Sequence, residues 1–284
     1  LGGEIVSMDS MQVYRRMDIG TAKPTQAERS SVTHHLIDIL EPTEPFTVAQ
    51  YASVAQAILD DVYQRGRLPI LAGGTGFYLR ALTDGLHLGG VKSDPELRES
   101  LKTLASTPEG RRVLHERLRA VDPASAAKLH ENDVQRVSRA IEVFELTGAP
   151  ICRQPSETPD QRFHFCLLGT DMERAALYAR INARVDAMLQ QGLLAEVEAL
   201  LGEGVSARAQ SMQGIGYKEL VPVLQGQMPL ADATVSLKQN TRHYAKRQWT
   251  WFRAESRVRW LDMIRKESTD EALRIGEAFW KEAQ

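Results

Sequence analysis

The hydrophobic residues of this chain form short runs separated by longer stretches in which polar and apolar positions are mixed. The short runs are rich in aliphatic and β-branched residues and end in small or polar residues, a pattern typical of buried strands. The predicted strands are Glu4 to Met8, Leu36 to Leu40, Leu68 to Ala72, Phe163 to Leu168 and Val258 to Leu261.

The stretches between these runs have a helical period. One extends from Val48 to Arg65, and a longer one extends from Met172 to about Leu201, with apolar residues at Leu177, Ile181, Val185, Met188 and Leu189. Strands that alternate with helices favour parallel pairing. The pattern therefore predicts an α/β fold with a mainly parallel sheet.

The strand pattern disappears from about Asp94 to Thr147, where helical segments follow one another. Proline and glycine residues interrupt these segments, at Pro108, Gly110, Pro123 and Gly148. We interpret residues 94–155 as a helical insertion domain.

Residues 1–93 and 156–284 then form the α/β core together with a set of C-terminal helices. The segment from Arg153 to Arg162 contains Pro155 and Pro159, so it is predicted to be a loop that leads back to the sheet near Phe163.

Composition excludes an integral membrane protein, because no apolar run approaches the roughly 18 residues that a spanning helix needs. Cys152 and Cys166 lack metal-ligand spacing and are too few for a disulfide scaffold. We expect buried or partly buried thiols in a reducing cytoplasm. The formal net charge of -2 gives no general attraction to nucleic acid, so RNA binding would require a local basic surface.

Asp9 follows the predicted strand Glu4 to Met8 directly. Ligands of open α/β sheets bind beyond the carboxyl ends of the strands, where a carboxylate can act as a general base. An aspartate in this position is also a common helix cap or magnesium ligand, so these roles remain open. The compact segment Asp18 to Pro24 has the composition of a turn.

A glycine-rich sequence, Gly73-Gly74-Thr75-Gly76, follows the strand Leu68 to Ala72 and begins a helix. The free N–H groups at such a junction suit an anion, and Thr75 would add a hydroxyl. The alternative is a tight turn that only packs the helix against the sheet.

Arg180 and Arg184 are four residues apart and therefore share one face of the long predicted helix. Together they could bind a diphosphate; alternatively, they form a solvated face that pairs with Glu173 or Asp186. The same two interpretations apply to a second pair at helical spacing, Arg136 and Arg139.

The segment Lys238 to Arg253 carries the strongest nucleic-acid pattern, because it is basic and contains no acidic residue. Its cations would reach phosphates, and its aromatic rings could hold unstacked bases. The alternative is an amphipathic helix whose tryptophans belong to the core. The cations are Lys238, Arg242, Lys246, Arg247 and Arg253, and the aromatic residues near them are Tyr244, Trp249, Trp251 and Phe252.

Taken together, these segments resemble the tRNA dimethylallyltransferases, also called tRNA isopentenyltransferases. The matching stretches follow the family order over nearly the whole chain: Ser7 to Tyr14, Met17 to Pro24, His34 to Asp38, Gly73 to Tyr78, Asn132 to Val143, Arg180 to Val185, Gln213 to Lys218 and Lys246 to Arg253. No single stretch is decisive, but the ordered set is specific.

The resemblance implies a P-loop NTPase or nucleoside-kinase-like core with a helical insertion. It further implies transfer of a dimethylallyl group from dimethylallyl diphosphate to N6 of adenine 37, beside the tRNA anticodon, by a magnesium-dependent, monomeric, cytoplasmic enzyme. In this family pattern Asp9 takes the proton from the amine, Thr75 lies close to the reacting centre, and Arg184, with Arg180 and Thr75, binds the diphosphate.

The resemblance also implies which residues contact the tRNA, in the anticodon stem-loop. These are Asp9, Ser10, Met11, Gln12, Arg98, Gln135, Arg136, Val137, Ser138, Arg139, Gln213, Gly214, Ile215, Gly216, Tyr217, Lys218, Lys246, Arg247, Gln248, Trp249, Thr250, Trp251, Phe252 and Arg253.

One departure from the family concerns the phosphate-binding loop ending in Gly-Lys-Thr or Gly-Lys-Ser, which does not occur in this sequence. The family places this loop just upstream of Leu1, where its lysine and hydroxyl would bind diphosphate and Mg²⁺. Magnesium is therefore expected to be held mainly by that loop and by the diphosphate. A protein truly without the loop should bind diphosphate poorly.

Two other functions remain open at this point. An adenylate prenyltransferase would share the chemistry, but the basic aromatic segment and the helical insertion favour tRNA as the acceptor. A non-catalytic RNA-binding protein would keep Lys246 to Arg253, but it would not need Asp9, Thr75 and Arg184 together.

Overall fold

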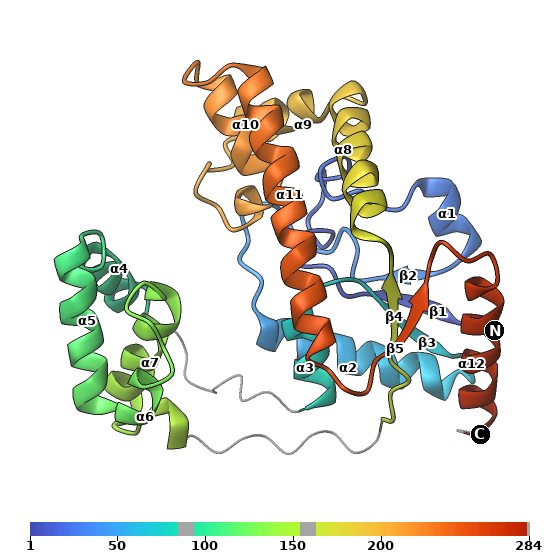
Figure 1. Ribbon diagram of the computed structural model, residues 1–284, viewed down its shortest axis with the longest axis horizontal. Coiled ribbons are helices and arrows are strands. Elements are labelled where there is room, and N and C mark those ends of the chain that lie inside the picture. Colours follow the sequence, from blue (N-terminus) through green and yellow to red (C-terminus); the bar gives the residue numbers. More distant parts are fainter. Residues whose placement is uncertain (85–93, 154–162, 283–284) are drawn as a thin grey trace. The chain divides into compact units, whose positions relative to one another are not determined.

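The computed structural model describes residues 1–84, 94–153 and 163–282. The chain divides into two compact units, and Figure 1 shows the elements of both. Unit 1 comprises Leu1–Thr83 and Asp160–Gln284, and unit 2 comprises Asp84–Pro159. The predicted limits at 93/94 and 155/156 involve residues outside the described ranges, as does most of the predicted loop from Arg153 to Arg162.

Three parallel strands form the first sheet of unit 1 in the order β2-β1-β3. They are β1 (Glu4–Ser7), β2 (His34–His35) and β3 (Pro69–Ala72). The central strand pairs Val6 with His35 on one side and with Leu71 on the other. The predicted strands at Glu4 to Met8 and Leu68 to Ala72 are therefore confirmed, as is parallel pairing.

The predicted strand from Leu36 to Leu40 is wrong, because β2 ends at His35. Leu36 and Asp38 have φ values of 61° and 56°, and a left-handed backbone cannot continue an extended strand. The segment from Leu36 to Leu40 instead lies alongside the residues that follow Asp9. The N–H groups of Asp38 and Ile39 donate to the carbonyl oxygens of Gln12 and Val13, at 3.2 and 2.9 Å.

A second, two-stranded parallel sheet joins β4 (Leu168–Asp171) to β5 (Arg259–Asp262). The strand predicted at Val258 to Leu261 is confirmed with a shift of one residue. The strand predicted at Phe163 to Leu168 is displaced, because pairing with β5 begins only at Leu168. A hydrophobic run alone cannot locate the first residue that finds a partner.

Some helices of unit 1 pack on these sheets, and others pack mainly on one another (Figure 1). They are α1 (Gln26–Ser31), α2 (Val48–Gln64), α3 (Gly76–Thr83), α8 (Arg174–Gln190), α9 (Leu193–Gly202), α10 (Tyr217–Leu224), α11 (Leu230–Arg253) and α12 (Ser268–Glu282), with a short 3-10 turn, η2, at Ser211–Gln213. The long helix α11 contacts α8 and α10 and reaches α3 at its C-terminal end.

Local sequence explains where two of these helices begin and end. Thr47 and Gln50 form a reciprocal capping box at the start of α2, as expected for a helix predicted from Val48. The single helix predicted from Met172 to Leu201 is instead two helices, because Gly192 adopts a φ of 102° between α8 and α9.

A buried carboxylate anchors the start of β1. Glu4 is 2% exposed, and its Oε1 accepts hydrogen bonds from Arg65 at 2.5 Å and Arg67 at 3.0 Å. Its Oε2 lies 2.7 Å from Nε2 of His35. The hydrogen bonds from Arg65 and His35 lower the pKa of Glu4 to about 2, so it is ionised at neutral pH.

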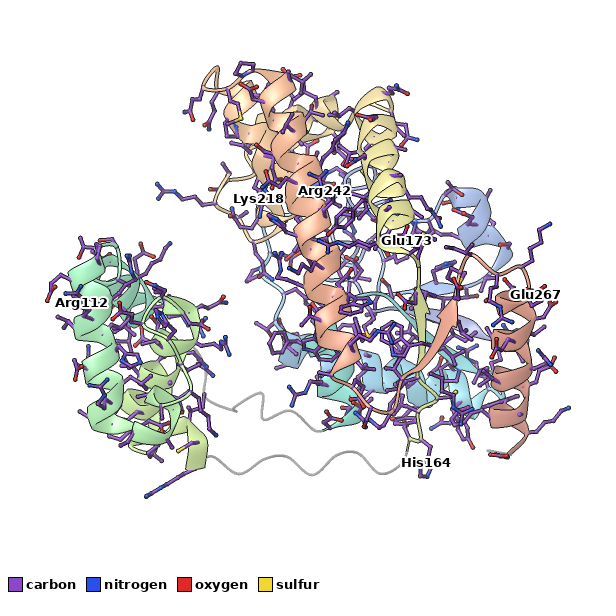
Figure 2. All side chains as sticks on the ribbon, viewed as in Figure 1. Arg112, His164, Glu173, Lys218, Arg242 and Glu267 are labelled. Atoms are coloured by element: carbon purple, nitrogen blue, oxygen red, sulfur yellow. The ribbon has the colours of Figure 1, made fainter. Side chains whose placement is uncertain are left out.

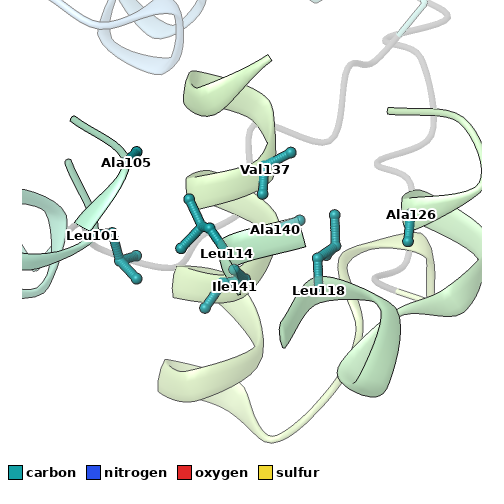
Figure 3. Packing of buried hydrophobic residues seen from close by; sticks show 8 residues of the cluster. All are labelled: Leu101, Ala105, Leu114, Leu118, Ala126, Val137, Ala140 and Ile141. Atoms are coloured by element: carbon teal, nitrogen blue, oxygen red, sulfur yellow. The ribbon is translucent and has the colours of Figure 1, made fainter. Parts of the chain in front are cut away.

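Unit 2 consists of helices in its described residues: α4 (Pro95–Leu104), α5 (Pro108–Val121), α6 (Pro123–Ala126), α7 (Val134–Thr147) and the 3-10 turn η1 (Ile151–Arg153). The first three start at a proline that follows a capping side chain. Figure 3 shows the buried cluster between them: Leu101, Ala105, Leu114, Leu118, Ala126, Val137, Ala140 and Ile141.

Two further expectations can be compared with the structure. Cys152 is exposed, so the expectation of a buried thiol is wrong for it, whereas Cys166 is partly buried as expected. Across the described ranges, every helix is too short or too polar to cross a membrane.

Candidate active site

Asp9 lies two residues beyond the carboxyl end of β1. Its Oδ1 accepts hydrogen bonds from the backbone N–H groups of Met11 at 2.7 Å and Gln12 at 3.2 Å. The carboxylate therefore closes a local turn. The alternative of a helix cap is wrong, because the first helix begins only at Gln26. Within the described residues Oδ2 has no hydrogen-bond partner, so the same side chain can also accept a proton.

The glycine-rich turn after β3 lies against the end of β1. The N–H of Met8 donates to the carbonyl oxygen of Ala72 at 2.7 Å, and the N–H of Thr75 donates to the carbonyl oxygen of Met8 at 3.2 Å. A Cβ atom at Gly73 would lie 2.4 Å from the carbonyl carbon of Met8, so only glycine allows this approach. Thr75 is thereby placed beside the strand that leads to Asp9.

The C-terminal part of α11 packs on the same turn. Nε2 of Gln248 donates to the carbonyl oxygen of Gly74 at 3.0 Å. A Cβ atom at Gly76 would lie 2.5 Å from the indole ring of Trp251. The basic aromatic segment and the glycine-rich turn, which are distant in the sequence, therefore form one site with Asp9.

Two tyrosines complete this site. Burial, together with the nearby charge of Asp9, raises the pKa of the Tyr244 hydroxyl, which hydrogen bonds with the side chains of Gln248 and Thr75. Burial also raises the pKa of Tyr78, and the nearby Tyr14 and Asp9 raise it further. The hydroxyls of Tyr244 and Tyr78 therefore stay protonated at neutral pH. The sequence prediction named Tyr244 only as an aromatic residue near cations and missed it as a neighbour of Thr75. Its position one helical turn before Gln248 indicates only that the two side chains share a helix face.

The segment from Gln213 to Lys218 lies beside the residues that follow Asp9. A Cβ atom at Gly214 would lie 3.1 Å from Sδ of Met11. The side chains of Gln213 and Lys218 are exposed, and Figure 2 labels Lys218 on α10. Tyr217 is fully buried, so its side chain offers no surface to a nucleic acid. Gly214 and Gly216 are also buried, and Ile215 is half-buried.

Glu196 on α9 is a second residue that the sequence prediction missed. Its carboxylate accepts the N–H groups of Asp18, Ile19 and Gly20 at 2.9, 2.8 and 3.0 Å, and the hydroxyl of Tyr217 at 2.6 Å. The signal for it is weak: Glu196 directly precedes Val197, a fully buried residue of the apolar face of α9.

Arg180 and Arg184 are exposed on α8, as the alternative of a solvated face requires, but among the described residues neither pairs with Glu173 or Asp186. Glu173 instead caps its own helix by accepting the N–H groups of Ala175 and Ala176, both at 2.9 Å. Asp186 instead pairs with Lys238 at 2.6 Å. No hydrogen bond in the described residues joins either arginine to Asp9 or Thr75.

The contact between α8 and α11 includes a hydrogen bond from Nη1 of Arg242 to Oδ1 of Asn182, at 2.7 Å. Figure 2 labels Arg242 on α11 and Glu173 at the start of α8. The guanidinium group of Arg242 therefore binds α8, although the sequence pattern grouped Arg242 with the cations that would reach phosphates.

The C-terminal turns of α11 present cations and an aromatic ring to solvent. Lys246, Arg247 and Thr250 are exposed, and Trp249 is 49% exposed. Trp251 and Phe252 are half-buried and contact each other edge to face, with ring centroids 4.7 Å apart. The core interpretation therefore applies to Trp251 and Phe252. Trp249 is about half exposed, with the guanidinium group of Arg253 5.2 Å from its ring centroid.

Arg253, at the end of α11, has a structural role. Its guanidinium group lies 4.2 Å from the ring centroid of Trp260 and forms an ion pair with Asp171. These contacts hold the end of α11 on the sheet formed by β4 and β5.

The candidate tRNA residues of unit 2 divide into buried and exposed groups. Glu142 is 0% exposed and binds Arg98 at 2.8 Å and Arg139 at 2.6 Å. Burial alone would raise the pKa of Glu142, but the hydrogen bonds from Arg139 and Arg98 lower it below its usual range. Val137 is fully buried, so its side chain belongs to the core and not to a binding surface.

The remaining candidates of α7 lie nearer the surface. Arg136 is 71% exposed and forms an ion pair with Asp133. Gln135 is exposed, whereas the hydroxyl of Ser138 is buried and has no hydrogen-bond partner in the described residues. Arg136 and Gln135 are therefore the side chains of α7 best placed to meet a ligand.

Metal binding by side chains alone has little support. Among the described residues no three His, Cys, Asp or Glu side chains form a group that could hold a metal ion. Mg²⁺ usually binds to proteins through one or two carboxylates together with substrate phosphates. The single carboxylate of Asp9 and the hydroxyl of Thr75 fit a metal ion that is held mainly by a diphosphate.

Comparison with known proteins agrees with this arrangement. Residues 12–255 match the family described as IPP transferase. The tRNA dimethylallyltransferase of Pelotomaculum thermopropionicum is 49% identical over 92% of this chain and 83% of its own length. That of Geobacillus thermodenitrificans is 46% identical over 98% and 88%.

Solved structures resemble the chain over almost its whole length. The full-length tRNA isopentenylpyrophosphate transferase of Bacillus halodurans has a TM-score of 0.72 and 41% identity, covering 100% of this chain and 89% of its own. A eukaryotic dimethylallyltransferase, described as acting on tRNA, has a TM-score of 0.75 and 27% identity, covering 96% and 71%. The family match and these relatives show that the chain belongs to the tRNA dimethylallyltransferase family, the IPP transferases.

Proposed function

We propose that the chain transfers the dimethylallyl group of dimethylallyl diphosphate to N6 of adenine 37 in tRNA and releases diphosphate. The observation that carries this proposal is the meeting of Asp9, the glycine-rich turn and the C-terminal turns of α11 in one site. A base, an anion-binding turn and a basic aromatic surface are what alkylation of a tRNA base requires.

The reaction replaces the bond between the allylic carbon and the diphosphate oxygen with a bond between that carbon and N6 of adenine. The N6 lone pair of adenine attacks that carbon while its bond to the diphosphate oxygen breaks, and the bonding electrons leave with diphosphate. Asp9 accepts the proton that N6 loses. A neutral exocyclic amine is a weak nucleophile, so a positioned carboxylate accelerates the step, typically by about 10²–10⁴-fold.

Charge on the leaving diphosphate must be stabilised as it develops. We assign this role to the guanidinium groups of Arg184 and Arg180 and to the Thr75 hydroxyl, which lies just before the start of α3. Exposure of both arginines and the absence of acidic partners among the described residues support the assignment. A Mg²⁺ ion bound to the diphosphate would supply further charge neutralisation.

The tRNA surface of unit 1 consists, in this proposal, of the residues after Asp9, the exposed side chains of 213–218 and the exposed side chains of 246–250. Adenine 37 must leave its stack to reach Asp9, which costs a few kcal/mol that protein contacts offset. Trp249 is exposed enough to stack on a base. In unit 2, Gln135 and Arg136 are proposed to bind the tRNA directly.

Two further expectations belong to this proposal. The acceptor tRNA and the exposed thiol of Cys152 both suit a reducing cytoplasm. We also propose that the enzyme acts as a monomer; in support, Asp9, the glycine-rich turn and the C-terminal turns of α11 meet within unit 1.

One assay tests the proposed reaction. The full-length protein, Mg²⁺ and radiolabelled dimethylallyl diphosphate are incubated with unmodified tRNA, with the same tRNA carrying guanine at position 37, or with AMP. We expect label on the unmodified tRNA alone. Label on AMP but not on tRNA would indicate an adenylate prenyltransferase, and tRNA binding without any labelled product would indicate a non-catalytic RNA-binding protein.

A further inference from the structure

The carboxylate of Glu196 forms a latch between α9, the segment Asp18–Gly20 and the start of α10. Oε2 accepts the N–H groups of Asp18 and Ile19, and Oε1 accepts the N–H of Gly20, all within 3.0 Å. Oε1 also accepts the hydroxyl of Tyr217 at 2.6 Å. Successive N–H groups that converge in this way form a site for an anion, and here the anion is a side chain of the protein.

The residues of the latch are closely packed. A Cβ atom at Gly20 would lie 2.5 Å from the ring of Tyr217, so the ring rests directly on the backbone that Glu196 binds. Burial, and after it the charge of Glu196, raises the pKa of Tyr217, which keeps the hydroxyl protonated as a donor. The 2%-exposed ammonium group of Lys23 then binds Asp18 at 2.6 Å and the carbonyl oxygen of Tyr14 at 2.8 Å.

Gln12 connects Thr21, which directly follows the latched segment Asp18–Gly20, to the proposed base. Its side-chain Nε2 donates to the carbonyl oxygen of Thr21 at 3.2 Å, and its Oε1 accepts the hydroxyl of Ser7, also at 3.2 Å. Its backbone N–H donates to Oδ1 of Asp9 at 3.2 Å. Gln12 therefore holds Asp9 at one end and Thr21, next to the latched segment, at the other.

The latch also reaches the loop that the proposed function assigns to tRNA. Tyr217 belongs to the stretch Gln213–Lys218, and Gly214 of this stretch packs on Met11, which directly precedes Gln12. A displacement of the latched segment would therefore move the proposed base and the neighbouring tRNA loop together.

We infer that Glu196 is a positioning residue for the alkyl-transfer step: through Asp18–Ala22 and Gln12 it fixes where the Asp9 carboxylate meets the adenine amine. This inference rests on the proposed function. In this inference Glu196 acts through its contacts with Asp18–Gly20 and Tyr217, not on a substrate. Its effect should appear in the rate of the chemical step, because a displacement of about 1 Å in a reacting group can reduce a rate about 100-fold.

The test is a single-turnover measurement with the full-length protein and saturating unmodified tRNA and dimethylallyl diphosphate. Glu196→Gln keeps the size of the side chain but presents an amide NH₂ to N–H groups that need an acceptor. We expect it to reduce the rate about 10-fold to 100-fold. Tyr217→Phe removes only one hydroxyl, so we expect a smaller reduction, of about 2-fold to 10-fold.

The matched control is Glu198→Gln, two residues away on α9, where the side chain is exposed. We expect its rate to stay within about 2-fold of the wild type. Thermal unfolding of each variant shows how much protein is folded. If Glu196→Gln does not fold, the comparison of Tyr217→Phe with Glu198→Gln decides the question.

A double-mutant cycle with Gln12→Ala separates positioning from a general loss of structure. Because Glu196 and Gln12 act in one chain of contacts, the combined rate loss should be smaller than the product of the separate losses. Independent losses, normal rates in the folded Glu196→Gln and Tyr217→Phe variants, or a lowered Tm with a normal rate would each overturn the inference. A wild-type protein that forms no product would instead refute the proposed function.

Discussion

The side-chain amide nitrogen of Gln248 lies 3.0 Å from the carbonyl oxygen of Gly74 and donates a hydrogen bond to it. This bond joins the basic end of α11 to the turn that presents Thr75. In the proposed function, a tRNA bound to the exposed residues of α11 would therefore meet the same turn that is proposed to bind the donor diphosphate.

Gly76 tests the packing of α11 on this turn. In Gly76→Ala the new methyl group would overlap the indole of Trp251, which a Cβ atom would approach to 2.5 Å. We expect a loss of about 1–3 kcal/mol in the free energy of unfolding, measured by urea denaturation. Gly202→Ala is the control, since a Cβ atom there meets nothing within 4 Å, and it should be neutral or slightly stabilising. Equal stability of the two variants would contradict the close packing.

Asp9 has two roles that one substitution separates. Asp9→Asn keeps an oxygen that can accept the N–H groups of Met11 and Gln12, but it removes the base. We expect Asp9→Asn and Asp9→Ala to reduce the single-turnover rate by a factor of about 100 or more, with tRNA affinity nearly unchanged. Thermal unfolding should show a lower Tm for the alanine variant only. Turnover of the asparagine variant close to that of the wild type would remove Asp9 from the role of base.

Lys246 and Lys238 lie on the same helix but differ in their partners. Lys246 is exposed, whereas Lys238 pairs with Asp186 at 2.6 Å. Lys246→Ala should weaken tRNA binding and reduce the slope of log K against log salt concentration by about 1. The Lys238→Ala variant should leave that slope nearly unchanged. Titration of labelled tRNA at several salt concentrations measures both, and equal slopes for the two variants would argue against α11 as the tRNA surface.

Arg136 and Arg139 should separate tRNA binding from the stability of unit 2. Arg136 is exposed, so Arg136→Ala should change the free energy of unfolding by less than about 0.5 kcal/mol while weakening tRNA binding. Arg139 binds the buried carboxylate of Glu142 at 2.6 Å, so Arg139→Ala should cost about 1–3 kcal/mol. Hydrogen exchange of unit 2 and tRNA binding measure the two effects. The prediction fails if Arg136→Ala lowers the stability more than Arg139→Ala does.

Glu4 should make stability depend on pH. Its folded-state pKa of about 2 lies below its usual value of 4.5, because Arg65 and His35 bind the ionised form. The stability that it contributes is therefore fully present above pH 4.5 and is lost as the pH falls toward 2. At neutral pH, Glu4→Gln should be less stable by about 1–3 kcal/mol. Urea unfolding across this pH window should show a steeper decline for the wild type; parallel curves would contradict the assignment.

Elements that depend on local pattern are those that the sequence predicts well. The apolar period from Val48 predicts a helix, and the capping pair Thr47 and Gln50 places its start at the same residue. The strand at Glu4 to Met8 and the position of Asp9 follow from the same kind of local information. The motif matches then identified the family to which the chain belongs.

Features that depend on distant contacts were missed. Leu36 and Asp38 adopt positive φ values that their residue types do not indicate, and the carboxylate of Asp38 binds Lys23 and Arg29. The role of Glu196 depends on its hydrogen bonds with the backbone N–H groups of Asp18–Gly20, about 180 residues earlier in the chain. Sequence spacing carries no information on such pairings, because residues far apart along the chain create them.

The strand β1 connects two features at its ends: the buried Glu4 cluster where it begins and Asp9, two residues beyond its end. A one-residue insertion or deletion between them would turn alternate side chains to the opposite face of the sheet and remove either the ion cluster or the carboxylate from its place. Exchange of Ile5 or Val6 for another aliphatic residue would not have this effect. Natural variation in this segment should therefore change the identity of the side chains and leave the number of residues constant.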